Sequence, residues 1–143
     1  MVLLPPRTIE PGSGFAAGRR FLLIITIMYP NMGIIGEPTM ISRIWHGWTT
    51  HENADAYENL LREEIFAGIA SRMTGGYQGI HLLRRDAGDE VEFVTIMWFD
   101  SMDAVKAFAG EDYETEVVPP KARLLLSRTS GRSTHYEVVE KPS

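Results

Sequence analysis

Glu90–Gly110 reads EVEFVTIMWFDSMDAVKAFAG, and this stretch decides the fold. Apolar side chains stand on both sides of the alternation over residues 91–99, which is typical of a central strand with two faces to cover. Asp100 and Ser101 each offer a side-chain oxygen that can accept a hydrogen bond from a first-turn N–H. Apolar residues then recur at helical spacing up to Gly110. The stretch therefore predicts a strand, a cap and a helix without a linker.

The composition indicates one ordinary globular domain. The chain has 143 residues, of which 44% are apolar and 23% charged, enough for a substantial core. The net charge of −5 provides no basic surface for a nucleic-acid backbone. The sequence has no cysteine, which excludes disulfides, thiolate metal ligands and a cysteine nucleophile. We therefore expect a cytoplasmic protein that binds neither nucleic acid nor membrane.

The first 39 residues differ in character from the rest, being rich in proline and glycine around one apolar run, Phe21–Met28. This run is too short to span a bilayer, and no signal-peptide cleavage site follows it. We expect residues 1–39 to be a poorly structured or loosely attached leader, unless the biological start is Met32 or Met40. Residues 40–143 are expected to form the domain.

The other elements follow from similar patterns. Met40–Trp48 alternates as a first strand, and Thr49 with Glu52 has the form of a capping box. The apolar stripe from Tyr57 predicts a helix that ends near Met73. Beyond it we expect a strand over Tyr77–Arg85, a tight turn over Asp86–Asp89, a short helix after Pro120, a polar loop over Ser127–Ser133 and a last strand over Thr134–Glu140. The order β-α-β-β-α-β predicts an α+β, ferredoxin-like fold: a four-stranded antiparallel sheet with helices on one face.

This arrangement leaves one face of the sheet uncovered. The first and third strands nevertheless carry apolar and aromatic side chains on both sides. A second copy of the same sheet, packed face to face, would bury them. We therefore expect a homodimer.

The histidines give a candidate catalytic residue but no metal site. The four are His46, His51, His81 and His135, and none stands at the spacing of a helical metal pair or in a cluster with carboxylates. His46 follows Trp45 on the first strand, where an imidazole beside indoles could orient an aromatic ligand as a base or hydrogen-bond donor. The alternative is a structural histidine near the edge of the sheet.

Aromatic residues form a second candidate set. Trp98 ends the third strand, where a pocket between sheet and helices could open, and is the second candidate catalytic residue. Trp45, Trp48 and Tyr77 are candidate substrate-binding residues, although rings on adjacent strands also form cores and interfaces. Arg84 is a candidate anchor for an anionic group, with exposure to water as the alternative. The sequence has no glycine-rich phosphate loop and no nucleophile elbow.

Residues 40–139 resemble the antibiotic biosynthesis monooxygenase-type proteins of the dimeric α+β barrel superfamily. The similarity rests on the segments ISRIWHGWT, ADAYENLL, GYQGIHLLRR, EVEFVTIMWFDSMDAVKAFAGEDYE, VVPPKAR and HYEVV. Its more specific parts are Trp98 followed by Ser101 before the second helix, and Phe108 followed by an acidic turn that contains Tyr113.

The resemblance implies a ferredoxin-like dimer with a cavity between sheet and helices, and either oxygenation without flavin or metal or oxidative haem breakdown. Haem-degrading relatives use a tryptophan at the Trp98 position, an asparagine on the first strand and a histidine near the second helix. This chain has Trp45-His46 at the first-strand position and no histidine in Val117–Pro120. Haem is therefore disfavoured, and we expect no cofactor.

Two functional hypotheses follow. The first is a monooxygenase, an oxidoreductase that acts on a small aromatic or quinol-like substrate, with Trp98 and Trp45 walling the pocket, His46 as base and Arg84 as anchor. Such substrates can themselves form the carbanion that reacts with oxygen. The protein therefore need only bind, desolvate and deprotonate them. The second hypothesis is a non-catalytic dimeric barrel that binds a small ligand or has a stress-related role.

Overall fold

The computed structural model describes residues 39–142, which belong to one compact unit. The predicted leader, except for its last residue, lies outside the described residues. The elements are β1 (Ile41–Thr50), α3 (His51–Leu60), the π-helical turn η2 (Leu61–Ile65), α4 (Phe66–Arg72), β2 (Tyr77–Ala87), β3 (Glu90–Phe99), α5 (Met102–Ala109), α6 (Pro120–Leu125), β4 (Leu126–Thr129) and β5 (Thr134–Glu137). None of these helices is long and apolar enough to cross a membrane.

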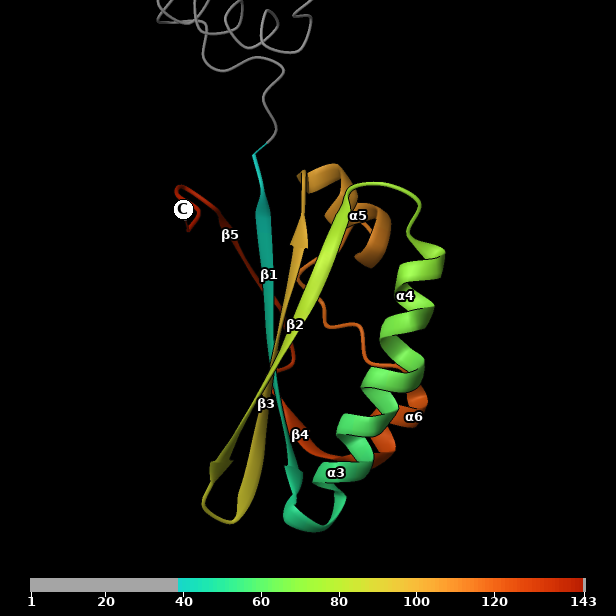
Figure 1. The fold of residues 1–143 in the computed structure, drawn as a ribbon, viewed down its shortest axis with the longest axis vertical. Coiled ribbons are helices and arrows are strands. Elements are labelled where there is room, and N and C mark those ends of the chain that lie inside the picture. The colour runs from blue at the N-terminus through green and yellow to red at the C-terminus, as the bar shows by residue number, and fades with distance from the viewer. Residues whose placement is uncertain (1–38, 143) are drawn as a thin grey trace, which may run out of the picture. The chain divides into compact units, whose positions relative to one another are not determined.

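The described strands form an antiparallel sheet with the helices on one face, as Figure 1 shows. The order is β2-β3-β1-β4, and β5 also pairs with β1. The predicted α+β, ferredoxin-like fold is confirmed, and its third strand is the predicted central one.

The predicted fourth strand is divided into two. β4 pairs with one end of β1, at Gly47–Thr49, and β5 pairs with the other, at Ile41–Ile44. Both therefore lie beside β1 in the position expected for a single strand. The prediction of a polar loop over Ser127–Ser133 was wrong at its start, because Ser127–Thr129 belong to the short edge strand β4, in which Ser127 and Arg128 are exposed.

The first helix begins one residue later than predicted. Thr50, not Thr49, is its N-cap: the Thr50 hydroxyl accepts from the Asn53 N–H at 3.1 Å. Thr49 is fully buried as the penultimate residue of β1, because pairing with β3 continues to the end of that strand. The cap predicted at Ser101 is confirmed, since its hydroxyl accepts from the Ala104 N–H at 3.1 Å.

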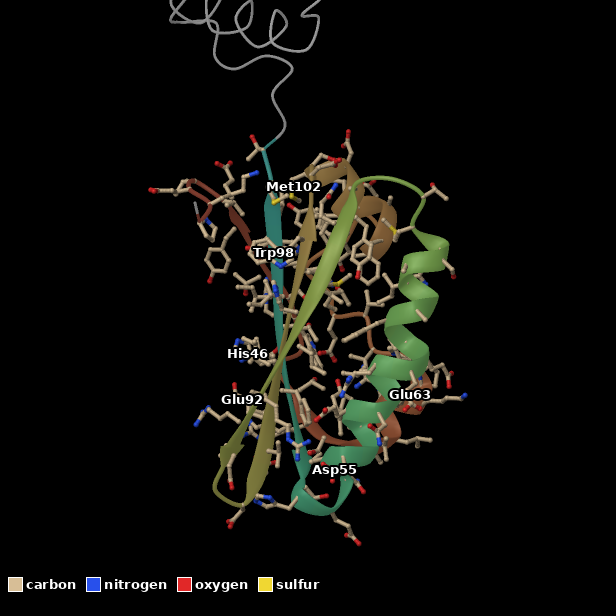
Figure 2. The ribbon with its side chains drawn as sticks, in the orientation of Figure 1. His46, Asp55, Glu63, Glu92, Trp98 and Met102 are labelled. Carbon is tan, nitrogen blue, oxygen red and sulfur yellow. The ribbon has the colours of Figure 1, made fainter. Side chains whose placement is uncertain are left out.

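The two faces of the sheet are defined by the strand register. On β1 and β3 the odd-numbered side chains face the helices, and Trp45 stands opposite Thr95. The even-numbered side chains face away, and His46 stands opposite Val94. In Figure 2, His46 and Glu92 project from the sheet on the side away from the helices. We call this side the open face; its central residues are Ile44, His46, Trp48, Leu83, Glu92, Val94, Ile96 and Trp98.

Two apolar clusters lie between sheet and helices. The first contains Ala54, Tyr57, Leu61, Val91, Phe93 and Ala122, and the second contains Ile41, Met97, Phe99, Ala104 and Val105. Thr95 separates the two along the helix-facing side of β3. The core therefore has a polar interruption at the middle of its central strand.

Candidate functional site

A cavity of about 60 Å³ lies between the sheet and the helices. The sheet contributes Arg43, Trp45, Ile80, Thr95 and Met97. The consecutive helical segments α3, η2 and α4 contribute Tyr57, Leu61, Ile65, Phe66 and Ile69. The lining is completed by Phe108, Val117, Val118, Pro119, Ala122 and Ser133. Leu61 and Ile65 are the two ends of the π-helical turn. Such turns are frequent at functional sites. An apolar cavity with a few inward polar groups is the usual form of a small-molecule site.

Arg43 is the cavity's charged residue and is only 3% exposed. Its guanidinium donates to the backbone oxygens of Tyr113 and of Thr115, the latter at 3.1 Å, and lies 3.0 Å from His135 Nε2. Because arginine has only donors, the imidazole accepts in this contact. Within residues 39–142, no carboxylate forms an ion pair with Arg43.

Burial sets the charge states of this pair. It lowers the pKa of Arg43 to about 10, so the guanidinium is still a cation at neutral pH. Burial and the nearby Arg43 charge lower the pKa of His135. At neutral pH the cavity therefore has one positive charge beside a neutral imidazole.

Tyr57 contributes a neutral phenol. It is 2% exposed and packs edge-on against Phe93, with the ring centroids 4.9 Å apart. Burial, and secondarily the negative charge of Glu116, raises the pKa of Tyr57. None of the hydrogen bonds found within residues 39–142 uses its hydroxyl, so this group can donate to a ligand.

Trp45 is held in the cavity wall by Glu116. Its indole Nε1 donates to Glu116 Oε1 at 2.7 Å. The same carboxylate accepts from Thr129, Gly131 and Arg123. Burial alone would raise the pKa of Glu116, but the hydrogen bonds from Trp45, Thr129 and Arg123 outweigh it and leave this pKa lowered. The Trp45 ring also covers Gly47, where an added Cβ would lie 2.3 Å from the Trp45 Cη2 atom.

Two other predicted substrate-binding residues face the helices but do not line this cavity. Tyr77 packs in the second core cluster, with its ring centroid 5.8 Å from that of Phe99. Arg84 pairs with Asp55 at 2.9 Å and with Glu58 at 2.6 Å, both on α3. These two carboxylates already neutralise Arg84, and its role as an anchor for an anionic group stays a prediction.

The predicted catalytic residues, together with Trp48, lie on the open face. His46 Nδ1 is 2.8 Å from Glu92 Oε2, and the Trp98 indole donates to His81 Nδ1 at 2.9 Å. Trp48 lies under the Arg128 guanidinium at 3.8 Å. The expectation that His46 and Trp98 share a pocket with Trp45 is therefore not met, because alternation sends even-numbered residues to the opposite face. At that end of β3 the helix-facing ring is Phe99.

The sequence interpretation missed Arg43, Tyr57 and Glu116. Arg43 had a readable signal: it stands between Ile41 and Trp45 at the same parity, so a charged side chain interrupts an otherwise apolar strand face. Tyr57 was assigned only to the apolar stripe of the first helix. Glu116 had no local signal. Within the described part of the chain, no group of three or more His, Asp or Glu side chains could hold a metal ion.

Comparisons with known proteins support the fold. No protein-family model matches this sequence, and no curated protein matches it. Among similar solved structures is a Bacillus cereus protein provisionally named an antibiotic biosynthesis monooxygenase, with a TM-score of 0.52 and 13% identity over 73% of this chain and 95% of that one.

Two further solved structures have lower TM-scores. SnoaB, a cofactor-independent oxygenase from Streptomyces nogalater, has a TM-score of 0.45 and 20% identity over 73% of this chain and 96% of its own. A dimeric ferredoxin-like protein from an uncultured marine organism has a TM-score of 0.45 and 17% identity over 74% of this chain and 100% of its own. The neighbours of this chain are thus monooxygenase-type and ferredoxin-like dimeric proteins, and this likeness is one of fold.

Proposed function

We propose that this protein is a small monooxygenase of the antibiotic biosynthesis monooxygenase type, which oxygenates a small aromatic or quinol-like molecule without a cofactor. The observation that carries the proposal is the cavity between sheet and helices, with an apolar lining and a few inward polar groups. The fold shared with the Bacillus cereus protein supports it as an analogy.

The chemistry requires little of the protein. A naphthol-type substrate loses its phenolic proton, and the resulting anion carries electron density at the ring carbon opposite the oxygen. Molecular oxygen takes up electrons at this carbon; one oxygen atom replaces the ring hydrogen as a carbonyl, and the other leaves as water. The apolar cavity walls would remove the anionic oxygen from bulk water, and the Tyr57 hydroxyl would donate a hydrogen bond to this oxygen.

A specific observation favours the non-catalytic alternative. His46 and Trp98, the residues expected to act in catalysis, both lie on the open face. The histidine nearest the cavity's charge, His135, already accepts a contact from Arg43. A barrel that only binds its ligand would need no base.

We also propose a cytoplasmic location, which the absence of cysteine supports.

Oxygen uptake tests the proposed activity. With 1-naphthol or 1,8-dihydroxyanthrone, uptake measured at an oxygen electrode is expected to exceed the protein-free rate at least tenfold. Tyr57→Phe is expected to lower the protein-dependent rate about tenfold to a hundredfold, because it removes a hydrogen bond to the anionic substrate oxygen that is worth about 1.5–3 kcal/mol. Tyr77→Phe is the matched control, since Tyr77 packs in the second core cluster and does not line the cavity. Its rate is expected to equal that of the wild type.

The same assay has outcomes that contradict the proposal. If both substrates react no faster with protein than without it, the binding-only alternative gains. If His46→Ala abolishes uptake while Tyr57→Phe leaves it unchanged, the chemistry takes place on the open face and not in the cavity.

We further propose that the protein is a homodimer formed through the open face. Ile96 lies on the central strand between Ile44 of β1 and His81 of β2. Leu83 and Tyr136, toward the sheet edges, are 47% and 55% exposed. A second copy of the same sheet would bury these apolar groups.

Ile96→Glu is expected to convert this dimer to a monomer. Light scattering should give about twice the chain mass of 16.1 kDa for the wild type and about 16.1 kDa for the variant. The cause is a carboxylate buried without a partner at the centre of the interface. Leu124→Glu, at a position 82% exposed on α6, should remain dimeric. A wild type that is monomeric at all concentrations would exclude the interface.

A further inference from the structure

Arg43 is a buried cation whose contacts within residues 39–142 leave its charge unbalanced. Its three polar partners are two backbone oxygens and one imidazole nitrogen. All three are neutral: backbone oxygens carry no net charge, and burial together with the nearby Arg43 cation lowers the pKa of His135. A guanidinium has five N–H donors, so donors are left for a further acceptor. Buried charges in proteins are normally paired, and pairing requires an anion here.

We propose that Arg43 is an anion-binding residue and that the ligand of this cavity carries a carboxylate or a similarly compact anionic oxygen group on an apolar body. The inference rests on the proposed function only in using the same cavity. Arg43 belongs to the cavity lining, and its ring neighbour Phe108, 5.5 Å below the guanidinium, belongs to the lining too. An anion reaching Arg43 would therefore have its organic body against apolar side chains.

The space available fits a ligand with a small head and a larger body. At about 10–15 Å³ for each water-sized position, the inner cavity of about 60 Å³ holds roughly four to six such positions, enough for a carboxylate and its first carbon. A surface depression of about 320 Å³ adjoins it, and both are lined by Ile65, Ile69, Phe108, Val117 and Pro119. Arg43 lines only the inner cavity. The ligand would thus place its anionic group inside and its ring in the depression.

The charges at the rim of the depression do not by themselves favour an anionic ligand over a neutral one. Glu64 and Arg72 both line it and carry opposite charges. A preference for an anion must therefore come from the inner end, where Arg43 is the charged side chain. This makes the inference testable at one residue.

The test compares two probes that share a ring system. Calorimetric titration of the wild type with 2-naphthoate and with 2-naphthamide is expected to give about tenfold to a hundredfold tighter binding of the carboxylate, the range for hydrogen bonds to a charged group. In Arg43→Met the two probes should bind equally. Arg43→Lys should keep part of the preference, because it keeps the charge but loses the forked geometry. Arg62→Met is the control: Arg62 is exposed and pairs with Glu58 on the helix surface, so the full preference should remain.

The comparison of the two probes in the wild type tests whether the cavity prefers an anionic ligand, even if Arg43→Met does not fold. Three outcomes would each overturn the inference: equal affinities of the wild type for the two probes, no binding of either probe at millimolar concentration, or a preference for the carboxylate that survives in folded Arg43→Met. The readout is independent of oxygen. A naphthoate preference without oxygen uptake would retain the anion site and remove the oxygenase, whereas uptake without the preference would do the reverse.

Discussion

Phe93→Ala is expected to lower the free energy of unfolding by about 4 kcal/mol, the typical loss for a phenylalanine truncated in a core. Phe93 is fully buried on the central strand, and its ring meets the Tyr57 ring at 4.9 Å. The substitution removes both the buried apolar area and this edge-on contact, and it leaves a space that Ala54 and Ala122 are too small to fill. Since domains of this size are stable by about 5–15 kcal/mol, the loss is a large fraction of the total.

Urea unfolding followed by circular dichroism measures this effect. Leu124→Ala is the control, because Leu124 is 82% exposed and its truncation should change the free energy of unfolding by less than about 0.5 kcal/mol. If Phe93→Ala lost no more than this control, the packing of α3 on β3 described above would be incorrect.

Glu116→Gln is expected to lower the free energy of unfolding by about 2 kcal/mol at pH 7. The carboxylate accepts from Trp45, Thr129, Gly131 and Arg123. A glutamine amide has one acceptor oxygen and an NH₂ group that cannot accept, so some of these donors lose their partner. The indole of Trp45 should then be held less firmly in the cavity wall.

The pH dependence identifies the carboxylate as the cause. The pKa of Glu116 is lower in the folded protein than its value of about 4.5 in the unfolded chain. Its contribution is therefore present above about pH 4.5 and is lost as the pH falls through the lower folded pKa. The difference between wild type and Glu116→Gln should shrink accordingly in acid. Glu64→Gln, at an exposed pair with Lys121, should cost less than about 1 kcal/mol. A loss in Glu116→Gln that is the same at pH 7 and in acid would assign the effect to packing.

Much of the fold could be predicted because its signals are local. The alternation over residues 91–99 and the oxygen of Ser101 each act within a few residues of chain, and the structure has the strand, cap and helix they predict. The choice between Thr49 and Thr50 as cap was not local, because it depends on how far β1 pairs with β3. β4 has polar side chains and little alternation, so its pairing with β1 leaves no pattern in the sequence.

The candidate site was harder to predict because both faces of the central strands are apolar. Alternation places Trp45 and His46 on opposite faces, but it does not say which face the helices cover. That choice depends on packing between distant segments, and it puts Trp98 on one side and Phe99 on the other. The partners of charged residues are also distant: Asp55 and Glu58 neutralise Arg84, whereas Arg43 receives no carboxylate among the described residues.

The position of the ligand is tested most directly by methyl NMR. Isoleucine side chains occur on both sides of the sheet: Ile65, Ile69 and Ile80 line the cavity, and Ile44 and Ile96 lie on the open face. Titration with 2-naphthoate is expected to shift the ¹³C-methyl signals of the first three and to leave those of Ile44 and Ile96 in place. Shifts at Ile44 and Ile96 with no change at the cavity residues would place the ligand on the open face and contradict the cavity as the functional site.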